Sequence, residues 1–106
     1  MKLKMDLSEQ GLLMFFKEYQ LNALKAIWKS EKGLNSREVW EAVGVDRISR
    51  ASIINFLQDA VENGLLDKYE ITGKGGHRGI YTPKHDEDGT RAYLTKIFKE
   101  RLESLI

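Results

Sequence analysis

The sequence has no cysteine, one proline and two histidines among its 106 residues. Without cysteine there is no disulfide framework, no thiol nucleophile and no thiolate ligand for zinc, and two histidines alone make a poor metal site. We therefore predict a protein that needs neither a metal nor a cofactor. The absence of cysteine fits a reducing compartment, and we predict a cytoplasmic location.

Long apolar runs and a strong net charge are also missing. The longest purely apolar run, residues 12–16, is five residues long, and the N-terminus has no small-residue cleavage site. We therefore expect neither a membrane span nor a signal peptide. Lys and Arg total 17 against 16 Asp and Glu, so no global field draws the chain to nucleic acid. Any affinity for DNA must come from local clusters of basic residues.

Residues 49–64 carry the most informative pattern of the chain. Ser49 can cap the first turn of a helix, and Gly64 can adopt the left-handed turn that ends it. Four apolar side chains recur at three- and four-residue spacing and predict a buried face: Ile53, Leu57, Ala60 and Val61.

The start of this segment is polar or basic and carries no acid before Asp59. Such a start is typical of a helix whose N-terminus enters the major groove of DNA, although an ordinary amphipathic surface helix is the alternative. The candidate DNA contacts in this region are Arg47, Ser49, Arg50, Ser52 and Asn55.

Two shorter helices are expected before this segment. Residues 17–30 show an apolar stripe with polar residues on the other side. Asn35 and Glu38 have the spacing of a capping box, which predicts a second helix that Gly44 stops. Two short helices joined by a tight, glycine-containing turn, with the second one capped by serine, are typical of a helix-turn-helix.

The periodicity then changes from helix to strand. Residues 65–71 and 80–82 read as two strands, and the four glycines within residues 72–79 predict a hairpin tip between them. The charged or titratable groups of this tip are Lys74, His77 and Arg78. A tip without acids suits contact with phosphates or with the minor groove. Glycines that only serve turn geometry are the alternative.

The two ends of the chain are expected to pack differently from the centre. Residues 1–16 form an N-terminal arm or short helix, whose apolar side chains pack on the domain or on a partner subunit. Residues 86–106 hold a final helix, over about residues 90–105, which follows a polar, acidic break. Because the core is nearly complete without this helix, we expect it to meet a second subunit. Packing back onto its own domain is the alternative.

The order helix, helix, capped helix, strand, glycine-rich wing and strand is the winged-helix arrangement. We therefore predict an α+β, mostly helical fold, with a winged helix-turn-helix DNA-binding domain over residues 17–85 and a C-terminal dimerisation helix. The chain resembles the penicillinase-repressor family of bacterial and archaeal transcription regulators. The residues that carry this resemblance are LKAIW at 24–28, SREVW at 36–40, the segment 53–66 and IYTP at 80–83.

The resemblance implies a homodimer in which the wing-bearing domains bind an inverted repeat and the C-terminal helices dimerise. It places the DNA contacts on Ser49, Arg50, Ser52, Asn55, Lys74 and Arg78.

These patterns together predict a sequence-specific DNA-binding transcription regulator, a homodimeric repressor whose partners are double-stranded DNA and a second copy of the chain, with no membrane. The near-neutral charge leaves one alternative, a winged-helix module that binds proteins of the transcription or chromatin machinery. An enzyme is not expected, because residues 73–76 lack the spacing of a phosphate-binding loop. Neither His77 nor His85 has a nucleophile or carboxylate partner placed by sequence spacing.

Overall fold

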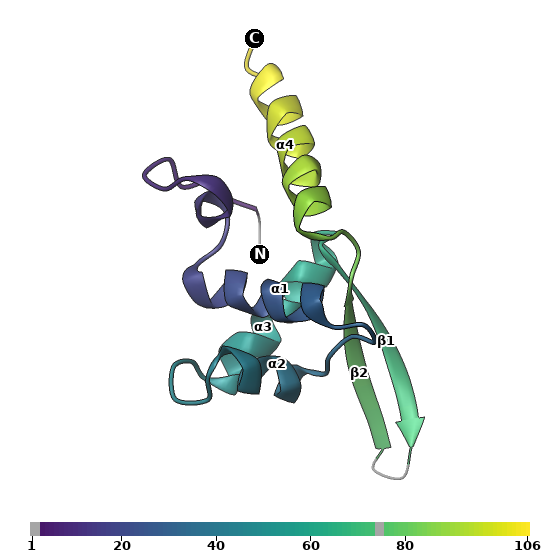
Figure 1. Ribbon diagram of the computed structural model, residues 1–106. Helices are drawn as coiled ribbons and strands as arrows, with labels where there is room; N and C mark the ends of the chain where they lie inside the picture. The colour runs from purple at the N-terminus through teal and green to yellow at the C-terminus, as the bar shows by residue number, and fades with distance from the viewer. Residues whose placement is uncertain (1–2, 74–75) are drawn as a thin grey trace.

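The computed structural model of the protein describes residues 3–73 and 76–106, with the backbone alone for residues 76 and 77. The elements in chain order are a 3-10 helix at Gly11–Met14, α1 at Glu18–Lys29, α2 at Ser36–Val43, α3 at Arg50–Glu62, β1 at Leu66–Gly73, β2 at Gly76–Pro83 and α4 at Glu87–Glu103. Helices α1, α2 and α3 form a compact cluster, from which the β-hairpin and α4 extend in opposite directions (Figure 1). The predicted α+β, mostly helical winged helix-turn-helix is confirmed.

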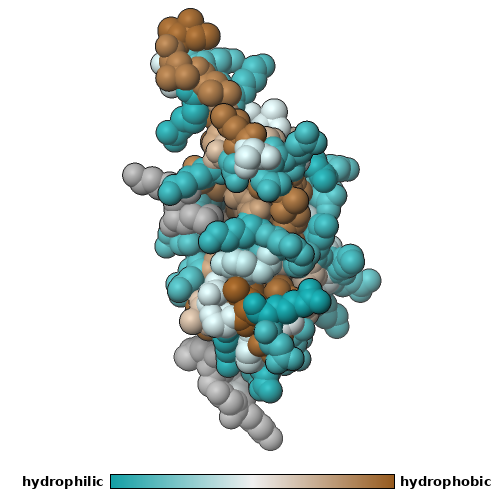
Figure 2. All heavy atoms as spheres, turned by 90° about the vertical axis from the view of Figure 1, so that its left-hand side faces the viewer, coloured by the Kyte–Doolittle hydropathy of each residue, from teal (hydrophilic) through white to brown (hydrophobic). Residues whose placement is uncertain are grey.

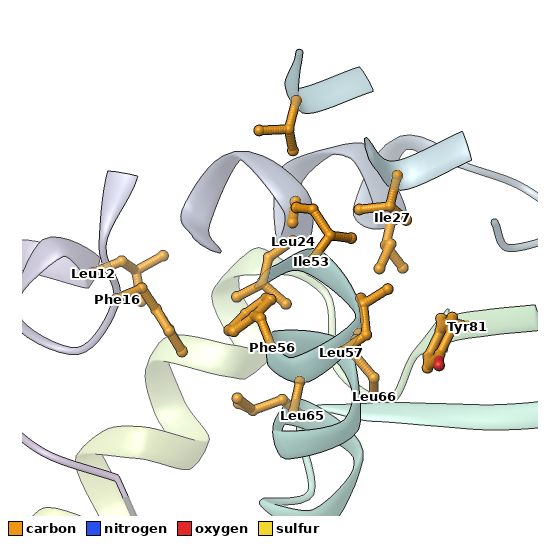
Figure 3. Close-up of a cluster of buried hydrophobic side chains, with 14 of the residues drawn as sticks. Leu12, Phe16, Leu24, Ile27, Ile53, Phe56, Leu57, Leu65, Leu66 and Tyr81 are labelled. Carbon is orange, nitrogen blue, oxygen red and sulfur yellow. The ribbon is translucent and has the colours of Figure 1, made fainter. Parts of the chain in front are cut away.

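Helix α3 supplies the centre of the hydrophobic core (Figure 3). Ile53, Leu57 and Ala60 are fully buried, as their spacing predicts, and Val61 is only partly buried. Phe56, which the predicted stripe omitted, is also buried, and its ring meets the edges of neighbouring aromatic rings from the N-terminal arm and α1. The other buried side chains of the core cluster come from every other element: Leu12, Phe16, Ala23, Leu24, Ile27, Val39, Val43, Leu65, Leu66, Tyr81 and Leu94.

The predicted helix ends are present. The side chain of Asn35 accepts a hydrogen bond from the Glu38 amide (2.8 Å), and Glu38 accepts one from the Asn35 amide (3.0 Å), which completes the capping box of α2. The turn after α2 is held by Trp40, whose indole N–H donates to the Ile48 carbonyl (2.8 Å). Gly64 follows α3 with φ +76°, a backbone conformation that would be strained for a residue with a side chain.

The hairpin is antiparallel, with Leu66 opposite Pro83 at its base and Gly73 opposite Gly76 at its tip. Its base is fastened to the loop between α1 and α2. Leu34 and Tyr81 exchange two backbone hydrogen bonds (3.0 and 2.8 Å) as an isolated bridge beside β2. This approach needs Gly33, because a Cβ there would lie 2.8 Å from the Tyr81 carbonyl oxygen. The wing is therefore held at a fixed angle to the helices.

The N-terminal arm packs on its own domain. Leu12 and Phe16 are buried in the core, and the Phe15 ring lies 4.9 Å from that of Phe98 on α4. Farther out, the Ser8 hydroxyl and amide donate to Asp6 and lower the pKa of its carboxyl group. The sequence left open whether the arm packs on its own domain or on a partner subunit. Its buried side chains pack on its own domain.

Helix α4 begins at Glu87, three residues earlier than the sequence pattern suggested. Asp86 caps the helix by accepting a hydrogen bond from the Gly89 amide (2.7 Å), and Glu87 and Asp88 are favourable in a first turn because of the helix dipole. The acidic segment expected to be a break is therefore mostly the start of the helix.

The two halves of α4 have different environments. In the first half, Leu94 is fully buried, and the Tyr93 hydroxyl donates to the Asn63 carbonyl (2.7 Å), which ties the helix to the end of α3. The second half still meets the N-terminal arm at Phe98 and then extends beyond the domain. Leu102, near the end of the helix, and Leu105 and Ile106, after it, are 53%, 81% and 107% exposed. This end is the apolar protrusion at the top of Figure 2.

We expect Leu94→Ala to lower the free energy of unfolding by about 2–5 kcal/mol, since it removes a buried side chain and leaves a cavity. Val45→Ala, in the turn after α2 where Val45 is 47% exposed, is the control and should change it by less than about 0.5 kcal/mol. Urea denaturation followed by circular dichroism measures both. Equal effects of the two changes would contradict a core that includes α4.

Candidate nucleic-acid interface

Three arginines from three elements meet beside the start of α3. Arg37 lies in the first turn of α2, Arg50 is the first residue of α3, and Arg78 lies on β2. Together with Asn35 and Ser36 they line a pocket of about 380 Å³, which we call the arginine pocket. The fixed angle of the wing is what brings Arg78 to the two helix starts.

None of the described residues that line the arginine pocket is acidic. Arg37 forms an ion pair with Glu41 (3.1 Å), but both side chains are more than half exposed, so the pair is weak. Within the residues that the structure describes, no ion pair or side-chain hydrogen bond engages Arg50 or Arg78. The guanidinium groups of Arg50 and Arg78 are therefore available to bind an anion, and that of Arg37 becomes available when its weak ion pair opens.

The backbone reinforces this positive potential. The pocket is lined by Asn35 and Ser36 at the N-terminus of α2, where the capping box pairs the amides of Asn35 and Glu38 and the helix dipole gives a partial positive charge. Guanidinium groups and a helix N-terminus are both suited to phosphate oxygens. The arrangement can hold a phosphodiester.

The polar side chains at the start of α3 have different local roles. Ser49 caps the helix by accepting a hydrogen bond from the Ser52 amide (3.1 Å), and its hydroxyl donates to the Ser52 hydroxyl (2.9 Å). Asn55 is exposed one turn further on. Ala51 and Gln58 share this exposed side of α3, although the sequence pattern did not single them out.

The predicted site residues are not all in one place. Arg50 and Arg78 share the arginine pocket, whereas Arg47 lines a separate groove between α1 and α2 with Lys25 and Lys29. Lys74 lies outside the described residues. For His77 only the backbone is described, paired with Thr72 near the hairpin tip.

Arg37 is the member of the arginine pocket that sequence reasoning missed. It stands two residues after the cap of α2 and four before Glu41, so the pattern fits an ordinary helical ion pair. A basic residue in the first turn of a helix, where acids are preferred, was the available signal.

A metal site and a membrane span are both absent from the part of the chain that the structure describes. Among the described residues, no group of three or more His, Cys, Asp or Glu side chains could hold a metal ion. Across the same residues, no helix combines the length and the apolar character needed to span a membrane.

The helix-turn-helix of α2 and α3 followed by the hairpin defines a winged-helix protein, and comparison with known proteins agrees with this class. No family model matches the chain, and no curated protein matches it. A solved structure described as "Possible transcriptional regulator from Methanosarcina mazei Go1" has the same fold, with a TM-score of 0.67 and 14% sequence identity over 85% of this chain and 73% of that one. At this identity the likeness establishes the fold.

We expect Ser49→Ala to destabilise the protein by about 1 kcal/mol, because the amide of Ser52 loses its acceptor at the start of α3. Ser49→Asn retains a capping oxygen and should stay close to the unmodified protein. Unfolding in urea compares the two variants. If they were equally stable, the cap would not be holding this end of α3.

Proposed function

We propose that this protein is a DNA-binding transcription regulator, in which α3 enters the major groove and the arginine pocket grips the adjacent phosphodiester backbone. The observation that carries this proposal is the convergence of Arg37, Arg50 and Arg78 beside the exposed side of α3. Phosphate contacts fix the register of a protein on the duplex, and an exposed helix next to them is placed to contact base edges.

The wing supplies the second contact of the proposed complex. β2 carries Arg78 on the same side as the helix starts, so the hairpin and α3 approach one duplex together. Arg47 lies in the separate groove between α1 and α2, and we leave it outside the proposed interface. The remaining proposed contacts are Ser49, Ser52, Asn55, Lys74 and His77.

We further propose a homodimer that represses transcription by occupying an inverted repeat, as the resemblance to the penicillinase-repressor family implies. The support is the free end of α4 with the residues that follow it, where three large apolar side chains are exposed to water. A twofold pair would bury such an end at a self-complementary interface. Two subunits related in this way would match two half-sites of opposite orientation.

Arg50→Ala and Arg78→Ala should each weaken binding to any duplex, by roughly 1.5 kcal/mol per subunit if one charge-assisted hydrogen bond is lost. The log–log dependence of affinity on salt should become less steep by about 0.9 for each phosphate contact removed. Fluorescence anisotropy with labelled duplexes over a range of salt concentrations measures both effects.

Arg91→Ala is the matched control for these variants. Arg91 is an exposed arginine on α4 that is paired with Glu87 (2.8 Å) and does not line the arginine pocket. It should leave both affinity and salt dependence unchanged. Arginine variants of the pocket that bind as tightly as the Arg91→Ala control would refute the proposed interface.

The double change Leu102→Glu and Leu105→Glu should shift the protein from dimer to monomer, because it places charges in the apolar contact. The affinity for DNA should fall as well, because a monomer contacts only one half-site whereas a dimer contacts both at once. Analytical ultracentrifugation reads the mass, with Ser104→Glu as a control that adds a charge to the same helix end. An unmodified protein that sediments as a monomer at tens of micromolar would contradict the dimer.

A further inference from the structure

The exposed side of α3 presents a row of three uncharged side chains before Glu62, which continues the same row at the last residue of the helix. Ala51, Asn55 and Gln58 follow each other at four- and three-residue spacing and are all exposed. Ile53 and Leu57 are fully buried on the opposite side, so the helix cannot rotate to hide this row. Within the described residues, neither amide side chain makes a hydrogen bond in the protein.

These three side chains have specific partners among the bases. In the major groove, adenine presents N7 as an acceptor beside its N6 amino group as a donor. The amide of Asn or Gln matches this pair, because its N–H donates to N7 while its oxygen accepts from N6. The methyl side chain of alanine makes apolar contact with the methyl group of thymine. The row therefore carries two adenine readers and one thymine contact.

Side chains that read the other base pair are missing from this row before Glu62 at its end. Guanine is read by Arg or Lys and cytosine by Asp or Glu. Arg50 lies beside the row but lines the arginine pocket with Arg37 and Arg78, where the proposed function assigns it to phosphate. Asp59 is half-buried with an interaction of its own, and Glu62 lies at the last residue of α3, away from the helix start.

We propose that Ala51, Asn55 and Gln58 read A·T base pairs, so that the core of each half-site is A·T-rich. This inference rests on the proposed function, since it requires α3 to lie in the major groove. From Ala51 to Gln58 the helix advances about 10 Å, at 1.5 Å per residue. That length covers about three base-pair steps of 3.4 Å, which is the extent of the expected core.

The test begins with selection of bound duplexes from a randomised pool by the full chain, followed by affinity measurements on the enriched duplex. We expect an A·T core, and replacement of one of its pairs by G·C should weaken binding about 5- to 150-fold. In Asn55→Ala and in Gln58→Ala, the same G·C replacement at the base pair read by the removed amide should weaken binding by no more than about twofold. Glu62→Ala, an exposed residue further along α3, is the matched control and should keep the preference.

Inosine·cytosine pairs distinguish base reading by α3 from reading of the minor groove by the wing. Such a pair presents the major-groove edge of G·C and lacks the minor-groove amino group, so it resembles A·T in the minor groove. Reading by α3 requires inosine·cytosine to be rejected as strongly as G·C. Acceptance of inosine·cytosine in place of A·T would assign the preference to the minor groove and overturn the inference.

Arg50→Ala separates this inference from the proposed function. It should weaken all duplexes by a similar factor while the A·T preference remains. A protein that binds DNA with no preference, or with a G·C core, overturns the inference and leaves DNA binding intact. A protein that binds no duplex at low salt overturns both. Circular dichroism of each variant confirms that the helices are formed.

Discussion

The burial of one side of α3 is the constraint on which the rest of the molecule depends. Ile53, Phe56 and Leu57 are within 2% of complete burial, and elements from both ends of the chain close around them. Such a packed core allows little rotation of the helix, because every apolar contact would be disturbed at once. The core therefore determines which side chains of α3 are exposed. In this way buried residues that contact no ligand decide which side chains of the helix can.

A second constraint is the angle between the wing and the helices. The Leu34–Tyr81 bridge and the close approach at Gly33 fix the base of the hairpin against the loop before α2. This angle places Arg78 of β2 beside Arg37 and Arg50. Three positive charges therefore line one pocket in a chain whose net charge is only +1. A neutral protein can thus present a strongly basic site, because the potential close to a surface depends on placement more than on the total.

The features that could be predicted from the sequence are those fixed by neighbours in the chain. The capping box of Asn35 and Glu38, the cap at Ser49 and the turn at Gly64 each involve residues within a few positions, and all are present. The start of α4 was placed too late, because an acidic run containing a glycine resembles a loop until the Asp86 cap is known. For the site, Arg50 was indistinguishable from Arg47 in the sequence. Only the tertiary fold sends one to the arginine pocket and the other to the groove between α1 and α2.

The shape of the molecule separates the arginine pocket from the apolar end of the chain. The hairpin and the free half of α4 extend in opposite directions along the 55 Å axis, so the basic surface and the apolar end do not overlap. A subunit contact at α4 would therefore leave the arginine pocket and the exposed row of α3 uncovered. Because the Tyr93 hydroxyl bonds to the carbonyl of Asn63 at the end of α3, the direction of α4 is tied to the helix that faces the proposed DNA. The spacing of two half-sites would then be determined by this one rigid joint.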